Sequence, residues 1–290
     1  METVVQLVLN ALHSSSLYAL VALGLTLVLG VLDIADFAQG ALYMVGAYVA
    51  FFATSAFGLS FFLALPLAMV VASLLAVTNY VAVYRPLRRF SGATTFIAAL
   101  GLLLILQNLA LLAFGADFRL VRNPFPGVRI SVLGATWTGY QAFLAGSMVA
   151  LVALVYLFLR RTPLGKALRA VSQNRKGALV VGLDPFRVEV AAFALAGALA
   201  GAAGTLASAV NAFDPSIAAI VVIKAFAIVI FGGMGSVPGA IVGALIVGLA
   251  ENLTGGLLST QYAELTAFVL MIAVLLARPR GLFGAQEAKL

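Results

Sequence analysis

The chain has 290 residues, of which 63% are apolar and only 9% are charged, and its mean hydropathy is +1.14. Soluble domains are roughly half apolar and about a quarter charged, so this composition excludes an ordinary soluble enzyme and predicts a protein that crosses a membrane repeatedly. The net charge is +7, from 17 Lys and Arg against 10 Asp and Glu, and the absence of cysteine excludes disulfides and thiolate metal sites.

Long stretches without charged residues mark the predicted membrane spans. Their apolar residues are continuous rather than alternating, which predicts helices rather than strands. We expect an all-α protein with about eight transmembrane helices and a short segment near Ser216–Phe231 that either crosses or re-enters the membrane. The expected spans lie in Thr3–Leu32, Phe37–Tyr84 (two, divided at Thr54–Ser60), Ser91–Ala116, Ile130–Leu159, Val190–Phe213, the apolar residues from Val237 to Ala250, and Gln261–Ala277.

Basic residues between the spans set the expected orientation. Arg85, Arg88 and Arg89 form one cluster, and segment 160–187 holds seven basic residues and one acid. Two spans separate these clusters, so they share a side, which the positive-inside rule assigns to the cytoplasm. This orientation puts the N-terminus outside, whereas the side of the C-terminus depends on whether the short segment crosses.

Two breaks between apolar helices are candidate parts of a solute pathway. The first contains Phe37–Gly40, and the second is the Gly-rich stretch Phe231–Ala240. Broken helices at membrane depth occur where they are buried in protein or line a water-filled cavity. A plain turn between helices is the alternative for the second break. The predicted pathway residues are Phe37, Gln39, Gly40, Lys224, Gly232, Gly233, Gly235, Ser236 and Glu251.

Lys224 lies within an otherwise uncharged apolar segment. An ionisable side chain inside a membrane is costly, which makes it a functional hypothesis by default. Lys224 could pair with Glu251, or its long stem could carry the ammonium to the interface.

Enzyme motifs are missing from the chain. Gly235-Ser236 has no nearby histidine base, because the one histidine is His13, which leaves a lysine as the alternative base. The stretch Leu164–Ala167 lacks the first glycine and the hydroxyl of a phosphate-binding loop. We therefore predict no catalytic residues, no cofactor and no metal site, and the chain is not expected to be an enzyme.

Segment 160–187 carries a further pattern. From Pro163 it predicts a short amphipathic helix with Leu164, Leu168 and Val171 on one side, followed by a polar break at Asn174–Lys176 and a second turn. An apolar helical face within a basic loop indicates a docking surface for a partner protein. An amphipathic helix resting on lipid is the alternative.

Four passages resemble the branched-chain amino-acid permeases, the membrane subunits of ATP-binding-cassette importers. They are Ala22–Gly30 with Asp36–Gly40 and Gly46–Tyr48, Thr162–Ala170 with Gly182–Asp184, Phe231–Gly243 with Ala250-Glu251, and Arg278–Gly284. The resemblance spans nearly the whole chain and is strongest to the shorter, H-type subunit of the leucine/isoleucine/valine system. Asp36 departs from the family, where Asn is usual, and we expect Asp33 and Asp36 at the membrane interface.

The resemblance implies a type II-like importer fold, with residues 1–290 as a single permease domain in a prokaryotic inner membrane. It also implies a complex with a second permease subunit (a heterodimer), two ATP-binding subunits and an extracytoplasmic substrate-binding protein, without nucleic acid. The segment 160–187 would be the cytoplasmic coupling loop, moved by the ATP-binding subunits. The residues implied in coupling are Thr162, Gly165, Arg169, Ala170 and Gly182.

Two alternatives stay open. Permeases for urea or short-chain amides, or for other amino acids, share these motifs. An ion-coupled secondary transporter would need no ATPase, but would more often show buried carboxylate or histidine relays than these spans do.

Overall fold

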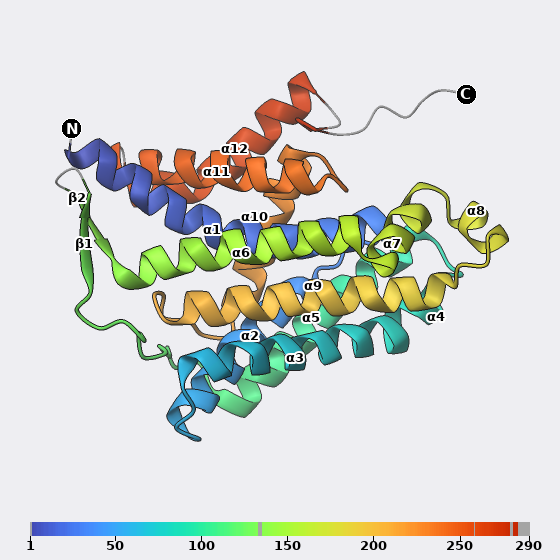
Figure 1. The fold of residues 1–290 in the computed structure, drawn as a ribbon, viewed down its shortest axis with the longest axis horizontal. Coiled ribbons are helices and arrows are strands. Elements are labelled where there is room, and N and C mark those ends of the chain that lie inside the picture. Colours follow the sequence, from blue (N-terminus) through green and yellow to red (C-terminus); the bar gives the residue numbers. More distant parts are fainter. Residues whose placement is uncertain (1, 133–134, 258, 279–280, 284–290) are drawn as a thin grey trace.

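The computed structural model describes residues 2–132, 135–257, 259–278 and 281–283; Pro279, Arg280 and Gly284 of the C-terminal passage lie outside them. The described chain is almost entirely helical (Figure 1). Its elements are α1 (Glu2–Leu32), α2 (Ala38–Ser55), α3 (Phe61–Asn79), the π-helical turn η1 (Tyr80–Tyr84), α4 (Arg85–Leu87), α5 (Gly92–Phe114), β1 (Arg129–Val132), β2 (Ala135–Thr138), α6 (Gly139–Arg161), α7 (Pro163–Gln173), α8 (Arg175–Val180), α9 (Pro185–Ser208), α10 (Ile217–Gly232), α11 (Val237–Leu257) and α12 (Thr260–Ala277).

Six helices of the described chain are long and apolar enough to cross a membrane, which confirms a multi-pass, all-helical membrane protein. These six are α1, α3 with its continuation to Leu87, α5, α6, α9 and α11. The expected number of about eight spans is not confirmed, because α2 and α12 are not among them. Helix α10 has 16 residues, or about 24 Å, which is shorter than the ~30 Å hydrocarbon core of a bilayer. It is the expected short segment.

One predicted span begins later than expected. Strands β1 and β2 pair in antiparallel fashion, with Arg129 opposite Thr138 and Ile130 opposite Trp137, so the helix expected from Ile130 starts only at Gly139. Thr138 and Gln141 form a capping box there: the Thr138 hydroxyl accepts from the Gln141 N–H at 3.2 Å, and Gln141 Oε1 accepts from the Thr138 N–H at 3.0 Å. This reciprocal cap satisfies orphan amides and begins the helix after the hairpin.

Different elements lie at the two ends of the long helices (Figure 1). The N-terminus and the β1–β2 hairpin lie at one end, where the Thr136 N–H donates to Gln6 Oε1 at 3.0 Å. Elements α4, α7 and α8 lie at the other end, and both predicted basic clusters are therefore on one side of the molecule. We call the end with α7 and α8 the basic end.

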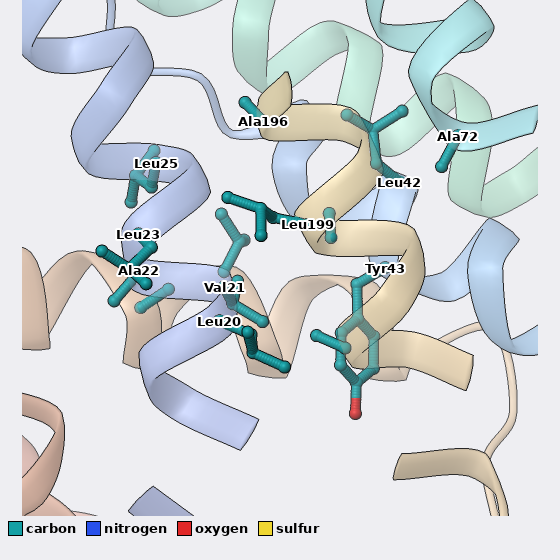
Figure 2. Packing of buried hydrophobic residues seen from close by; sticks show 14 of the residues in the cluster. Leu20, Val21, Ala22, Leu23, Leu25, Leu42, Tyr43, Ala72, Ala196 and Leu199 are labelled. Atoms are coloured by element: carbon teal, nitrogen blue, oxygen red, sulfur yellow. The ribbon is translucent and has the colours of Figure 1, made fainter. Parts of the chain in front are cut away.

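Helices α1 and α9 form the centre of the molecule. Figure 2 shows Val21 and Leu199 together between these two helices, and both side chains are almost fully buried. Small residues let the backbones of α9, α2 and α3 approach closely: a Cβ on Gly201 would lie 2.7 Å from the Ala68 carbonyl oxygen, and one on Gly46 would lie 2.6 Å from Gly201 Cα. This is the small-residue packing typical of membrane helices.

Candidate functional site

Lys224 of α10 and Glu251 of α11 form an ion pair between consecutive helices. Lys224 Nζ lies 2.5 Å from Glu251 Oε1, and the two side chains are 17% and 10% exposed. The Tyr18 hydroxyl on α1 donates to Glu251 Oε2 at 2.6 Å and accepts from Lys224 at 3.3 Å. Of the two alternatives for Lys224, the structure thus shows pairing with Glu251. An ion pair so shielded from water is costly to break on one side only.

A small pocket lies beside this pair, between α1, α2 and α10. Its volume is about 180 Å³. The polar residues that line it are His13, Ser14, Tyr18, Tyr43, Asn211 and Lys224. A few converging polar groups in an otherwise apolar pocket are the usual basis for holding a small polar solute.

The first break differs from the expectation at Asp36. Asp33 is exposed and ends α1 with a left-handed backbone (φ +56°), whereas Asp36 is buried. The expectation that both acids lie at the interface is therefore wrong for Asp36. Asp36 Oδ1 accepts the Ala38 N–H at 3.0 Å, at the start of α2, and the Tyr84 hydroxyl at 2.5 Å. These hydrogen bonds compensate the carboxylate for its lost hydration.

Phe37 connects the first break to α10 and α5. Its ring stacks on Phe226 at 4.3 Å and meets Phe96 edge-on at 5.1 Å between centroids. Phe37 also lines an apolar pocket of about 410 Å³ together with Met234, which lies in the second break. The structure thus brings the two predicted breaks to one pocket through these two side chains.

Gln39 and Gly40 lie at helix contacts instead of in a pocket. Gln39 is fully buried, and its Nε2 donates to the Ala196 carbonyl of α9 at 2.9 Å. A Cβ on Gly40 would lie 2.8 Å from Val222 Cβ, so α2 and α10 touch there. The pathway role of these two residues stays a prediction.

The second break is a tight turn with two left-handed glycines. Gly233 (φ +106°) and Gly235 (φ +77°) adopt conformations that cost little only for glycine. The Ser236 hydroxyl accepts the Gly239 N–H at 3.1 Å and so caps α11.

Two residues of the C-terminal passage form backbone hydrogen bonds to this turn. The Leu282 N–H donates to the Phe231 carbonyl at 3.0 Å, and the Phe283 N–H donates to the Gly232 carbonyl at 2.9 Å. The last carbonyls of α10 thereby find partners within the chain. The C-terminal passage and the second break, two of the four passages recognised in the sequence, are one structural unit.

Helix α7 is the predicted amphipathic helix of the coupling loop. The Thr162 hydroxyl accepts the Gly165 N–H at 3.0 Å and donates to the Phe158 carbonyl at 2.7 Å, which turns the chain from α6 into α7. A Cβ on Gly165 would lie 2.7 Å from the Leu159 carbonyl oxygen, so α7 packs on the backbone of α6. Glycine is thus required at position 165, because a larger side chain would clash with the backbone of α6.

The apolar face of α7 is turned toward the protein itself. Leu168 and Val171 are buried, and α7 contacts α1, α6 and α9. The expectation that this face meets a partner is therefore wrong for Leu168 and Val171, which the chain's own helices cover, whereas Leu164 of the same face is 38% exposed. Arg169 and Lys166 lie on the exposed side, while Ala170 is partly buried.

The tip of α8 offers exposed apolar surface at the basic end. Leu179, Val180 and Val181 are 55%, 87% and 75% exposed. The Asn174 side chain accepts the Gly177 N–H at 2.8 Å, so α8 begins at Arg175 and the predicted polar break shrinks to Asn174 alone. Gly182 (φ +79°) follows the tip in a left-handed conformation and turns the chain toward α9.

Sequence reasoning missed a polar cluster at the basic end. Glu189 of α9 is buried, and it accepts hydrogen bonds from Arg88, Arg175 and Tyr80. Arg88 belongs to the first basic cluster and Arg175 to the second, which confirms that the two clusters share a side. A lone acid next to an apolar block is the signal that could have pointed to Glu189. Arg175 is 14 residues away along the chain, but Arg88 and Tyr80 are 101 and 109 residues away.

The described chain is thus a multi-pass helical membrane protein with buried polar clusters between its helices, an architecture that fits a membrane transport permease. The family described as "Branched-chain amino acid transport system / permease component" matches residues 7–275, and the chain belongs to this family.

Relatives support this assignment over nearly the full length. The chain is 32% identical to the permease BraD of Pseudomonas aeruginosa, covering 98% of this chain and 97% of that protein. It is 33% identical to LivH of Escherichia coli K12, covering 98% and 96%. It is 28% identical to LivM of the same organism, covering 94% and 69%. All three are named as high-affinity branched-chain amino acid transport system permease proteins. No solved structure matches this chain.

Proposed function

We propose that this chain is a permease subunit of an ATP-binding-cassette importer and forms part of the pathway for leucine, isoleucine and valine. The observation that carries the proposal is the match over 98% of the chain to relatives named for this transport. These relatives come from prokaryotes, so we place the chain in a prokaryotic inner membrane, with residues 1–290 acting as one permease domain.

A second permease subunit completes the pathway in this proposal. The weaker match to LivM supports a partner of related fold, because LivH and LivM occur as two differently named permeases of one organism. We therefore expect a heterodimer.

The basic end would meet two ATP-binding subunits. An apolar anchor surrounded by exposed cations fits a partner groove with an apolar centre and acidic rim. The tip of α8 offers such an anchor, with Lys166, Arg169 and Lys176 exposed on the same segment. The opposite end, with the β1–β2 hairpin, would face a substrate-binding protein outside the cell. ATP hydrolysis takes place on the partners, and this chain supplies the pathway.

The Lys224–Glu251 pair supports a site in that pathway for the charged groups of the substrate. An amino acid carries a carboxylate and an ammonium, which are complementary to the lysine and the glutamate. The apolar pocket lined by Phe37 and Met234 suits an aliphatic side chain. These roles, like those of the other predicted pathway and coupling residues, are part of the proposal.

Reconstituted uptake tests the function. The chain is purified with the permease, ATP-binding and binding-protein subunits encoded beside it and placed in proteoliposomes with radiolabelled leucine. We expect uptake that requires ATP and the binding protein and is inhibited by isoleucine and valine. Inhibition by urea or acetamide instead would favour an amide permease, and uptake driven by an ion gradient without ATP would favour a secondary transporter.

A further inference from the structure

Two buried carboxylates at the basic end are held by tyrosines of a single π-helical turn. The Tyr80 hydroxyl donates to Glu189 Oε2, and the Tyr84 hydroxyl donates to Asp36 Oδ1 at 2.5 Å. Both tyrosines belong to η1, and all four residues are at most 1% exposed. Single π-helical turns inside α-helices are rare and frequently occur at functional sites.

The tyrosines are also held together by a third ring. Phe193 of α9 stacks on Tyr80 at 4.8 Å and on Tyr84 at 5.3 Å between centroids, with interplanar angles of 25° and 29°. Close-packed buried rings leave no room for one to shift independently of the others. The two hydroxyl groups, and the carboxylates that they bond, are thus joined through a compact stack.

Each carboxylate connects to a different part of the molecule. Glu189 accepts from Arg175 Nε of α8 at 3.1 Å, so it is tied to the coupling loop. Asp36 accepts the Ala38 N–H that begins α2, directly beside Phe37 and its apolar pocket. A continuous set of hydrogen bonds and ring contacts therefore runs from α8 to the first break.

We propose that Tyr80 and Tyr84 are positioning residues that transmit movement of the coupling loop to the first break. This rests on the proposed function, since it is the ATP-binding subunits that would move α8. Displacement of Arg175 would pull on Glu189 and Tyr80, and Tyr84 would carry the shift to Asp36 and the start of α2. Coupling of this kind is carried by packed and hydrogen-bonded groups whose arrangement depends on both of the sites that they connect.

The first experiment compares uptake with ATP hydrolysis in the reconstituted complex. Tyr80→Phe and Tyr84→Phe each remove one hydroxyl and keep the ring. Tyr140→Phe is the matched control, because Tyr140 is equally buried and its hydroxyl donates to the Leu206 carbonyl at 2.5 Å, outside this set. We expect the number of leucine molecules imported per ATP to fall at least fivefold in either test variant and to stay unchanged in the control. The double variant should be no worse than the more impaired single variant, since the two act in series.

An unchanged import ratio in both test variants would overturn the proposal. So would an equal fall in the Tyr140→Phe control, or strictly multiplicative losses in the double variant, because each would point to general packing. Membrane abundance of every variant is measured alongside.

The second experiment needs no transport. Hydrogen exchange of the amides of residues 37–40 is measured in the purified chain carrying Arg175→Gln. Arg187→Gln is the control, since Arg187 pairs with Asp184 on the surface of the same segment and not with Glu189. We expect at least threefold faster exchange with Arg175→Gln alone, and no further increase when Tyr80→Phe is also present. Equal exchange in Arg175→Gln and the control would overturn the link. Absence of ATP-driven uptake by the unmodified complex would instead reject the proposed function, and the exchange result would still decide the link.

Discussion

Lys224 Nζ and Glu251 Oε1 lie 2.5 Å apart, and the residues stand on the two helices that flank the Gly-rich break. The pair links α10 to α11 away from the turn that connects them. The hydrogen bond from Tyr18 links the pair to the central helix α1. This arrangement makes both charges tolerable at low exposure.

We expect Lys224→Met to lower leucine uptake more than tenfold at unchanged membrane abundance, because the change removes the ammonium that faces the polar pocket. Glu251 keeps its hydrogen bond from Tyr18 but loses its cation, which lowers the free energy of unfolding, so uptake is compared per folded protein in the membrane. Glu251→Gln should also impair uptake, and the double variant should lose less than the two effects combined, since the partners are in contact. Radiolabelled uptake with immunoblotting measures both quantities. Normal uptake by Lys224→Met would reject the role, and strictly additive effects would reject the functional pairing.

Cysteine labelling tests whether the apolar pocket between the breaks belongs to the pathway. In this cysteine-free chain, Met234→Cys should react with a small charged thiol reagent, and the rate should fall at least fivefold when transport is arrested. Ala200→Cys should be unreactive in every state, because position 200 is fully buried in α9 and is not a predicted pathway residue. Equal reactivity at both positions, or none at position 234, would contradict the assignment.

The close contact between α7 and α6 predicts a stability effect at Gly165. Gly165→Ala should lower the free energy of unfolding by roughly 1–3 kcal/mol, because the added methyl overpacks the contact with Leu159. Gly101→Ala in α5 is the control: nothing lies within 4 Å of the added methyl, and alanine there should stabilise the helix by about 0.5–1 kcal/mol. Thermal unfolding in detergent compares the two. A destabilisation of Gly101→Ala equal to that of Gly165→Ala would contradict the packing argument.

The exposed tip of α8 predicts the position of the docking surface. Val180→Asp should reduce copurification of the ATP-binding subunits at least tenfold without affecting insertion, since it places a charge where an apolar anchor would be desolvated. Phe118→Asp is the control, because Phe118 is 75% exposed but lies beyond α5, away from the basic end. Arg169→Glu should act in the same direction through reversed charge. Full recovery of the ATP-binding subunits with Val180→Asp would show that the docking surface lies elsewhere.

Local patterns in the sequence were sufficient for most helix positions. Uninterrupted apolar stretches and the Gly-rich break led to the ends of α1 and α10 to within one residue, because each depends on neighbours along the chain, whereas α9 begins and ends five residues earlier than the expected span. The start of α6 was missed since residues 130–138 carry no charged side chain, like the first 21 residues of the helix that follows. The apolar face of α7 was visible in the sequence, but what it packs against was not.

By itself, the sequence determined that this is a multi-pass helical membrane protein of the branched-chain amino-acid permease family, because apolar runs and short motifs are properties of adjacent residues. Only the tertiary structure decided that Lys224 pairs with Glu251 and Tyr18, that Asp36 is buried, and that Glu189 joins the two basic clusters. The physical reason is the same in each case. The energy that makes a buried charge tolerable comes from partners far away in the chain, and their proximity arises only when the helices pack.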